Sequence, residues 1–266
     1  MPLRLSPTFR AALAASDRPL AGMWVCSGSA LVAEIAAGSG LDWLLVDMEH
    51  SATSLDSVLA QLQVAAAYPV TPVVRVAWND PVTIKRVLDV GAQNLIVPMI
   101  STEDEARAAV AATRYPPQGI RGVGSALARS ARWNRVDDYL AEAAEHVSLT
   151  VQIETTAGVA NAAGIAAVEG VDAVFVGPSD LSASMGLLGQ QSHPDVVAAV
   201  HAVFTACRDA GTPVGVNAFD PAVADAYLDA GADFVAVGAD VALLARASEA
   251  LTARFVTGRA AQRDSY

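Results

Sequence analysis

Residues 170–177 read GVDAVFVG, and three other stretches follow the same pattern: GLDWLLVD at 40–47, GAQNLIVP at 91–98 and GADFVAVG at 231–238. Each begins with a glycine, which suits the left-handed position that ends a helix, and continues into an apolar run. A continuous apolar run predicts a strand that is covered on both faces, as in a parallel sheet flanked by helices. The repeat therefore indicates units in which a helix, a short turn and a buried strand follow one another.

The rest of the chain continues this alternation of β-branched runs and alanine-rich helical stretches. We predict strands at residues 22–26, 43–47, 73–76, 94–97, 149–153, 173–176, 214–217 and 234–237. We predict helices at residues 55–67, 81–89, 103–114, 195–210 and 221–229. Eight strand–helix units in 266 residues predict one closed (β/α)8 barrel, an α/β fold spanning residues 1–266. A doubly wound open sheet is the alternative, but no GxGxxG motif follows the first strand.

One long segment interrupts the alternation. Residues 115–134 read YPPQGIRGVGSALARSARWN, which is rich in glycine, proline and arginine. Long loops inside a compact domain are usually functional or disordered, and we interpret this one as an active-site loop. Residues 136–146 then predict an extra helix before the fifth strand.

Composition and charge exclude several classes of protein. The net charge of −11 disfavours nucleic acid and anionic membrane surfaces as partners. Hydrophobic residues make up 53% of the chain, yet no apolar run reaches transmembrane length and no signal peptide is recognisable. Such a composition favours extensive burial, including subunit interfaces. Two cysteines, Cys26 and Cys207, show neither a disulfide framework nor a metal spacing, so we predict a reducing, cytoplasmic location.

In a (β/α)8 barrel the catalytic groups stand at the carboxyl ends of the strands. Glu154 and Asp180 end neighbouring predicted strands, so their carboxylates can converge in the barrel mouth. Two adjacent carboxylates repel each other, and a hard divalent cation such as Mg²⁺, Mn²⁺ or Co²⁺ relieves this repulsion. The alternative is that they cap helices, since Asp180 precedes the helix-like LSASM.

Two further strand ends carry candidate catalytic groups. His50 follows Asp47 by three residues, which is a usual arrangement for a general base oriented by a carboxylate, although a structural histidine is the alternative. Arg75 ends an apolar strand and needs an anionic partner, which is a substrate oxyanion or one of Asp47 and Glu49. The GVGS run at 122–125 could bind an anion through backbone N–H groups. We interpret the remaining histidines as surface residues: His146, His193 and His201.

The chain contains a single lysine, Lys85, inside a predicted helix. Aldolases stabilise the intermediate beside a carbonyl either with a Schiff-base lysine or with a metal acting as a Lewis acid. A helical Lys85 does not easily reach the barrel mouth, so Schiff-base and pyridoxal phosphate chemistry are disfavoured.

Long stretches of the chain carry a resemblance to a known family. They are DWLLVDMEH (42–50), WNDPVTIKRVLDVGAQNLIVPM (78–99), RYPPQGIRGVGSALARSARWN (114–134), VQIET (151–155), GVDAVFVGPSDLSASMG (170–186) and FVAVGADVALLARASEAL (234–251). The chain resembles the HpcH/HpaI aldolases of aromatic-acid degradation. The resemblance implies a (β/α)8 barrel that reversibly cleaves 4-hydroxy-2-oxo acids to pyruvate, or an analogue such as hydroxypyruvate, and an aldehyde. It also implies a hexamer or trimer with an exchanged terminal helix.

The resemblance assigns roles to residues of this chain. Glu154 and Asp180 correspond to the metal ligands, His50 with Asp47 to the base, and Arg75 to the group that steadies the enolate oxygen. Asp89 is similar to a residue that acts across a subunit boundary. The residues that match substrate-binding positions are Trp24, Ser125, Gln152, Gly177, Pro178, Ser179 and Asn217.

Three positions depart from the family pattern. Met48 stands where relatives usually have glycine, Ser179 where they often have alanine, and Asn217 where they often have leucine. Because Asn217 would lie near the aldehyde, it points to a more polar hydroxyaldehyde as the acceptor.

Two other functions stay open from the sequence. A lyase acting on acyl-CoA esters needs a basic entrance for the cofactor's phosphates, for which Arg121, Arg129, Arg132 and Arg135 are candidates. A catalytically silent barrel is the non-enzymatic alternative, but a packing role does not call for so many polar residues at strand ends.

Overall fold

Eight parallel strands close into a barrel in the computed structural model, which describes residues 3–256. Each strand pairs with its neighbours in the sequence, and β8 pairs with β1. The strands are β1 Leu20–Val25, β2 Trp43–Asp47, β3 Thr71–Arg75, β4 Asn94–Val97, β5 Ser148–Ile153, β6 Ala173–Val176, β7 Val214–Asn217 and β8 Phe234–Ala239. The predicted (β/α)8 barrel is confirmed.

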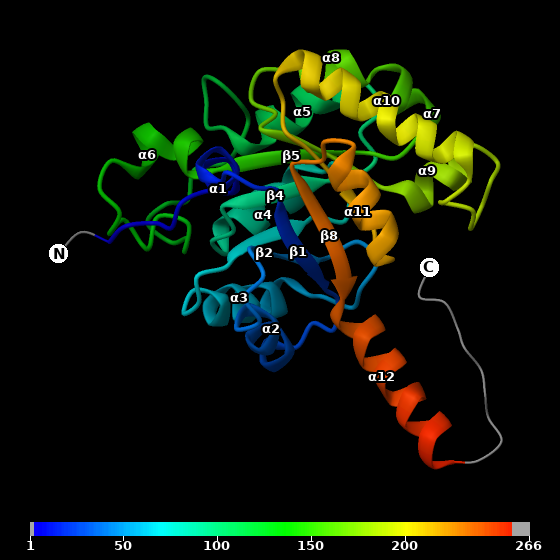
Figure 1. Ribbon diagram of the computed structural model, residues 1–266. Coiled ribbons are helices and arrows are strands. Elements are labelled where there is room, and N and C mark those ends of the chain that lie inside the picture. The colour runs from blue at the N-terminus through cyan, green and yellow to red at the C-terminus, as the bar shows by residue number, and fades with distance from the viewer. Residues whose placement is uncertain (1–2, 257–266) are drawn as a thin grey trace.

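Helices surround the barrel between these strands (Figure 1). They are α1 Phe9–Ala15, α2 Ala30–Ala37, α3 Leu55–Ala65, α4 Pro81–Asp89, α5 Glu103–Thr113, α6 Tyr139–Glu142, α7 Thr156–Ala160, α8 Ala162–Ala166, α9 Pro178–Ser184, α10 Pro194–Ala210, α11 Pro221–Asp229 and α12 Asp240–Phe255, with a 3₁₀ turn η1 at Ala143–His146. No helix within residues 3–256 combines the length and apolarity needed to cross a membrane.

The extra helix predicted at 136–146 is shorter than expected. Asp138 adopts a left-handed φ of 55°, so the helical turn α6 begins only at Tyr139. Three preceding residues are also left-handed: Arg132, Trp133 and Asn134. Such dihedrals are incompatible with a right-handed helix, and the last part of the segment is 3₁₀ instead of α-helical.

Large aromatic side chains fill the barrel interior, and two of them are each placed against a glycine. Trp43 is fully buried, and a Cβ on Gly22 would lie 2.4 Å from its ring. Phe234 stands against Gly215 in the same way, again at 2.4 Å. Phe9 of α1 closes one end, with ring centroids 5.4 Å from Trp43 and 5.1 Å from Phe234. The interior is therefore packed with side chains, and Phe9 closes this end.

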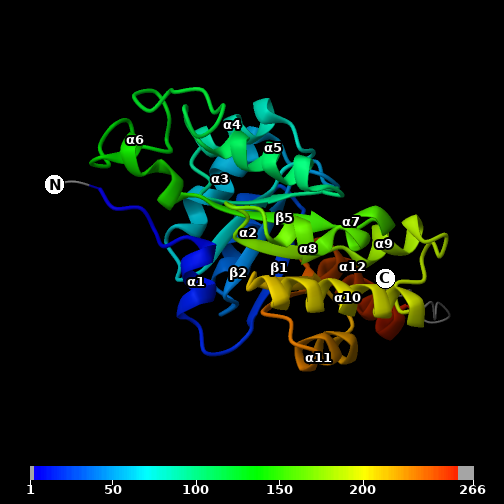
Figure 2. The same cartoon turned by 90° about the horizontal axis from the view of Figure 1, so that it is seen from above.

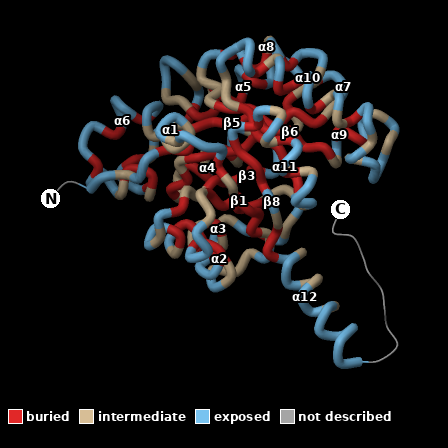
Figure 3. Tube along the Cα trace, viewed as in Figure 1, coloured by how far each residue is buried: buried red, intermediate tan, exposed pale blue. Residues whose placement is uncertain are grey.

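The two ends of the molecule differ in what covers them. Figure 2 shows α1 and α6 at one end and α9 and α12 at the other. Because α9 and α12 directly follow β6 and β8, their end is the one to which the strands' carboxyl termini point. Helix α12 leaves the body of the barrel and is exposed along most of its length (Figures 1 and 3). The carboxyl end is consequently open, as a catalytic end of this fold should be.

Candidate active site

A cavity of about 610 Å³ opens at the carboxyl ends of the strands, and we call it the mouth cavity. Its lining includes eleven of the residues that the sequence analysis selected: Trp24, Asp47, His50, Arg75, Gln152, Glu154, Gly177, Pro178, Ser179, Asp180 and Asn217. These residues come from six different strand ends and are far apart in the sequence. The barrel topology thus gathers them at one point.

Asp47 is the anchor of the turn that follows β2. Its Oδ1 accepts hydrogen bonds from the backbone N–H of Glu49 at 3.0 Å and from Arg75 Nε at 2.8 Å. Its Oδ2 accepts from the backbone N–H of His50 at 3.1 Å. Both carboxylate oxygens are therefore occupied, although Asp47 is only 1% exposed. These hydrogen bonds fix the conformation of the turn.

The predicted side-chain pair of His50 and Asp47 does not form in this chain. Asp47 bonds the backbone of His50 and not its ring, because the tight turn brings the amide nitrogen to the carboxylate first. The His50 side chain is 63% exposed, and its Nε2 lies 3.9 Å from Glu49 Oε1. Asp47 thus positions His50 through the main chain and leaves the ring facing the cavity.

Arg75 bridges both acidic residues that were considered as its partners. Its Nη1 lies 2.8 Å from Glu49 Oε2 while its Nε bonds Asp47. The guanidinium also lies over the Trp24 ring, 4.2 Å from the centroid, and Trp24 Nε1 donates to Asn217 Oδ1 at 2.7 Å. These contacts hold the guanidinium in one orientation at the cavity wall, and Nη2 has no acceptor among residues 3–256.

Glu154 is a buried carboxylate at the end of β5. Its Oε1 accepts from the backbone N–H of Met99 at 2.8 Å, and its Oε2 accepts from Gln152 Nε2. Met99 adopts a left-handed φ of 59° to aim its N–H, which is strained backbone for a side chain of this size. Gly177 is required beside it, since a Cβ there would lie 2.6 Å from Glu154 Oε2. Burial raises the pKa of Glu154 to about 7 against the opposing hydrogen bonds from Gln152 and Met99.

Asp180 lies in the first turn of α9 and lines the cavity. The alternative that this pair caps helices does not hold: the N-cap of α9 is Gly177 and that of α7 is Thr155. The charge of Asp180 contributes to the raised pKa of Glu154 and to that of Glu49. The three carboxylates are therefore electrostatically linked.

Glu49 is the functional candidate that sequence reasoning missed, since it was considered only as an ion-pair partner. Burial, the largest cause, raises its pKa to about 7, and the charges of Asp47 and Asp180 act in the same direction. Its Oε2 is buried and forms no hydrogen bond of good geometry, although Arg75 Nη1 is close. The signal that could have found it is its place in the DMEH stretch, where three of four residues are ionisable.

Two predicted site residues lie away from the mouth cavity of their own chain. Asp89 ends α4 and bonds Arg121 Nη2 at 3.4 Å, and Ser125 is buried in the loop of residues 115–134. Neither lines the cavity. The helix α6 that follows this loop lies with α1 at the amino end of the barrel (Figure 2). Within one chain, therefore, the loop does not reach its own mouth cavity.

Most of the arginines near this loop have structural partners. Arg121 is completely buried and its guanidinium lies 4.7 Å from the Tyr115 ring centroid. Arg129 donates to the carbonyl of Val90 at 3.2 Å, and Arg132 donates to the carbonyl of Arg129. They do not form an open basic surface beside the mouth cavity.

Three other groups can be assigned from their surroundings. Lys85 lies on α4 and does not line the mouth cavity. Cys26 does line it, but burial raises the pKa of this thiol to about 12, so it is not a ready nucleophile. Of the histidines expected at the surface, His201 is exposed, whereas His146 is half-buried and stacks on Tyr139. His193 is also half-buried, and its Nδ1 caps α10.

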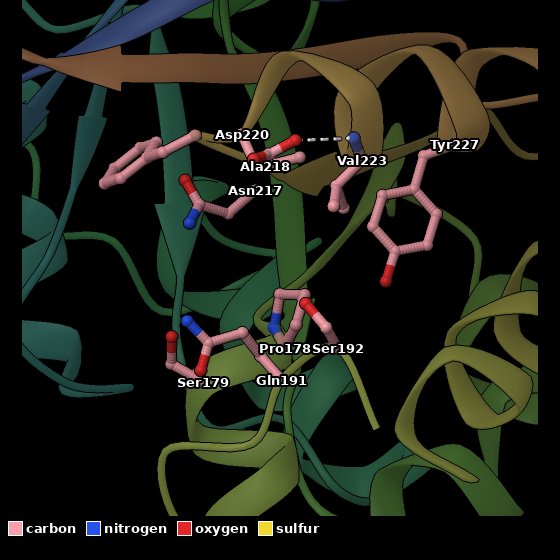
Figure 4. A pocket seen from close by; sticks show the side chains of 10 residues that line it. Pro178, Ser179, Gln191, Ser192, Asn217, Ala218, Asp220, Val223 and Tyr227 are labelled. Carbon is pink, nitrogen blue, oxygen red and sulfur yellow. Dashed lines mark hydrogen bonds between the residues drawn. The ribbon is translucent and has the colours of Figure 1, made fainter. Parts of the chain in front are cut away.

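A smaller pocket of about 40 Å³ adjoins the mouth cavity, and we call it the side pocket. Figure 4 shows it between the end of β7, α11 and the loop that precedes α10. Its lining residues are Pro178, Ser179, Gln191, Ser192, Asn217, Ala218, Phe219, Asp220, Val223 and Tyr227. Five of them also line the mouth cavity, so the two spaces are continuous.

Residues 20–247 match the family model described as HpcH/HpaI aldolase/citrate lyase. The chain belongs to this family. HpcH/HpaI relatives include a 4-hydroxy-2-oxo-heptane-1,7-dioate aldolase of Shigella sonnei, 54% identical over 93% of this chain and 94% of the relative. One of the same name from Salmonella arizonae is 55% identical over 93% and 94%. A solved HpcH/HpaI family structure from Burkholderia cenocepacia has a TM-score of 0.88 at 43% identity, over 92% of this chain and 97% of that one.

Class II aldolases of the HpcH/HpaI family use a divalent cation, and the donors in the mouth cavity fit one. Within residues 3–256, no group of three or more His, Cys, Asp or Glu side chains is arranged to hold a metal ion. The fit rests on Glu154 and Asp180 together with the buried Oε1 of Gln152, which has no hydrogen-bond partner. A set of oxygen donors with linked negative charge suits a hard cation. Burial raises the pKa of Glu154, and a bound cation would lower it again by stabilising the ionised carboxylate.

Proposed function

We propose that this chain is a divalent-cation-dependent class II aldolase. In this reaction a 4-hydroxy-2-oxo acid is reversibly cleaved to pyruvate, or to an analogue such as hydroxypyruvate, and an aldehyde. The observation that carries the proposal is the buried Glu154 beside Asp180, with Arg75 held across the same cavity. The activity named for the relative from Shigella sonnei, 54% identical, supports the same reaction class.

Glu154 and Asp180 are the proposed ligands of the cation, with Mg²⁺, Mn²⁺ and Co²⁺ as the candidates. When bound, the cation supplies Lewis-acid stabilisation of the negative charge that develops on the 2-oxo group. Gly177 and the first turn of α9 form the nearby wall. Pro178 has no N–H and the Gly177 N–H donates to the Ile153 carbonyl at 3.2 Å, so the Ser179 N–H is the backbone donor there that is suited to the substrate carboxylate. Gln152 Oε1 faces the same region without a partner.

His50 transfers the proton in the proposed reaction, and Arg75 stabilises the developing negative charge. In cleavage, His50 accepts the proton of the 4-hydroxyl while the C3–C4 bond breaks and its electron pair moves toward the 2-oxo oxygen. The aldehyde forms at C4, and His50 returns the proton to C3 to give pyruvate. Arg75 presents Nη2 to the developing negative charge, since Nε and Nη1 are held by Asp47 and Glu49. Asp47 acts as the positioning residue for both groups.

The position of Lys85 outside the mouth cavity argues against a Schiff base and against pyridoxal phosphate. The partners we expect are small 2-oxo acids and aldehydes, with neither nucleic acid nor membrane. Cys26 and Cys207 are both free thiols, which is compatible with the proposed cytoplasmic location.

Assembly into a trimer or hexamer is also part of the proposal. Helix α12 exposes Leu243, Leu244 and Leu251, each more than half accessible, on an element that leaves the barrel. An apolar helix of this kind is suited to burial against another copy of the chain. Asp89 and Ser125, which lie outside their own mouth cavity, would then serve a neighbouring subunit.

An acyl-CoA ester lyase is less well supported. Arg121, Arg129 and Arg132 are committed to Asp89 or to backbone carbonyls, so they do not offer a phosphate-binding entrance. A silent barrel does not explain why Glu154 is buried at the expense of a raised pKa.

The test is pyruvate release from 4-hydroxy-2-oxoheptanedioate and from shorter 4-hydroxy-2-oxo acids, beside a panel of CoA thioesters. We expect pyruvate from the oxo acids only, with loss of activity in EDTA and recovery when Mg²⁺, Mn²⁺ or Co²⁺ is restored. Turnover of CoA thioesters without pyruvate release from oxo acids would replace the aldolase by the lyase. Full activity in EDTA would refute the cation site.

A further inference from the structure

The side pocket extends the mouth cavity away from Glu154 and toward α11. Asn217, Gln191 and Phe219 belong to both linings, so a molecule bound in the mouth cavity can place its far end in the side pocket. A water molecule needs roughly 10–15 Å³ of such space. The 40 Å³ of the side pocket therefore accommodates two or three water-sized groups, such as a hydroxymethyl group.

Unused hydrogen-bonding groups face this space. The indole N–H of Trp24 can only donate, so Asn217 must present Oδ1 to it and direct its two Nδ2–H groups elsewhere. Tyr227 is 2% exposed, and its hydroxyl bonds no residue in the described part of the chain. Figure 4 shows the amides of Asn217 and Gln191 on either side of the opening and the Tyr227 hydroxyl directed toward Ser192.

The charges around the side pocket disfavour an anion. Its lining contains no lysine or arginine and contains Asp220, whose Oδ1 caps α11 by accepting from the backbone of Ala222 and Val223. The single arginine of the mouth cavity, Arg75, is already shared by Asp47 and Glu49. A second carboxylate on the substrate would thus be desolvated near Asp220 without a cation to pair with it. Neutral hydroxyl groups match the free amides and the phenol without this penalty.

We propose that the side pocket selects the acceptor aldehyde and takes a neutral, hydroxylated tail in preference to a carboxylate or an alkyl tail. This inference rests on the proposed aldolase function and names its substrate class. Asn217 and Tyr227 are the residues that determine the selectivity, through N–H and O–H groups that contact the tail. The tail takes no part in the reaction, in which pyruvate C3 loses a proton and forms a bond to the aldehyde carbon, while the carbonyl π bond opens and the aldehyde oxygen takes up the proton to become the 4-hydroxyl.

The experiment measures kcat/KM for addition of pyruvate to three acceptors: glyceraldehyde, propanal and succinic semialdehyde. We expect the wild-type enzyme to prefer glyceraldehyde over each of the others by at least tenfold. Asn217→Leu and Tyr227→Phe should each lower the ratio of glyceraldehyde to propanal at least fivefold. This ratio is taken on one preparation, so the fraction of folded enzyme cancels. Tyr68→Phe makes the same chemical change at a half-buried site outside both cavities, where the hydroxyl bonds Glu34, and should leave the ratio unchanged.

The inference would be overturned if kcat/KM for succinic semialdehyde equalled that for glyceraldehyde. It would also be overturned if neither variant changed the ratio of glyceraldehyde to propanal. Exchange of the pyruvate methyl protons with deuterium of the solvent requires no aldehyde. It therefore tests the proposed aldolase function separately from the acceptor selectivity of the side pocket. Exchange without acceptor preference refutes the side-pocket inference and leaves the aldolase intact. Absence of exchange refutes the aldolase function and the inference together.

Discussion

Replacing Glu154 by glutamine should stabilise the metal-free protein, and the gain should grow with pH. Glu154 is 1% exposed and its pKa is raised from 4.5 to about 7, so the folded state resists ionisation of this group. The unfolded chain ionises Glu154 near pH 4.5, whereas the folded chain does so only near pH 7. Stability is therefore lost as the pH rises through this window, and it is not regained above it.

The magnitude follows from the two pKa values. One pKa unit corresponds to about 1.4 kcal/mol, and integration between pH 5 and pH 8 gives a loss of roughly 2.5 kcal/mol from Glu154 alone. Glutamine has the same shape and can still accept the N–H of Met99. The amide of Gln152 can turn its unpartnered Oε1 toward the new N–H group, so the substitution need not leave an unpaired donor.

The assay is urea denaturation of both proteins in EDTA at pH 5 and pH 8. We expect the stability of Glu154→Gln relative to the wild type to increase by about 2 kcal/mol between the two pH values. A constant difference, or a variant that is less stable at pH 8, would refute the conclusion that burial without a cation makes this carboxylate unfavourable.

Three further predictions concern other parts of the molecule. Gly22→Ala brings a Cβ to 2.4 Å from the Trp43 ring and should lower the free energy of unfolding by about 1–3 kcal/mol in urea denaturation; an unchanged midpoint would contradict the tight interior. Arg75→Lys cannot span Asp47 and Glu49, so kcat/KM for cleavage should fall about 100-fold, and near-normal turnover would remove Arg75 from the mechanism. Leu244→Glu on exposed α12 should dissociate the proposed trimer or hexamer in light scattering, whereas Ala202→Glu on the outer face of α10 should not.

The fold could be predicted from the sequence because buried strands appear in it as local apolar runs. β2, β4, β6 and β7 have the predicted bounds, and three of them belong to the repeat that begins with glycine. The short helices α2, α7 and α8 were not predicted, since segments of five to eight residues carry no clear helical period. Their formation depends on packing against the barrel.

The site was predictable to the extent that it depends on strand ends. Barrel topology alone brings Glu154, Asp180, Arg75 and Asn217 into one cavity. The sequence could not reveal which hydrogen bond Asp47 makes, because the choice between the ring and the backbone of His50 depends on the geometry of one turn. It also could not place Ser125, since the loop after α5 carries no periodic signal that fixes its direction.

The central claim is that the mouth cavity forms the enolate of pyruvate with the help of a divalent cation held by Glu154 and Asp180. The most direct test is proton NMR of pyruvate in D₂O with the enzyme and no aldehyde. Loss of the methyl signal in Mg²⁺, its arrest by EDTA and its absence in Glu154→Gln are the expected results. Exchange that continues in EDTA, or at the wild-type rate in Glu154→Gln, would contradict the claim.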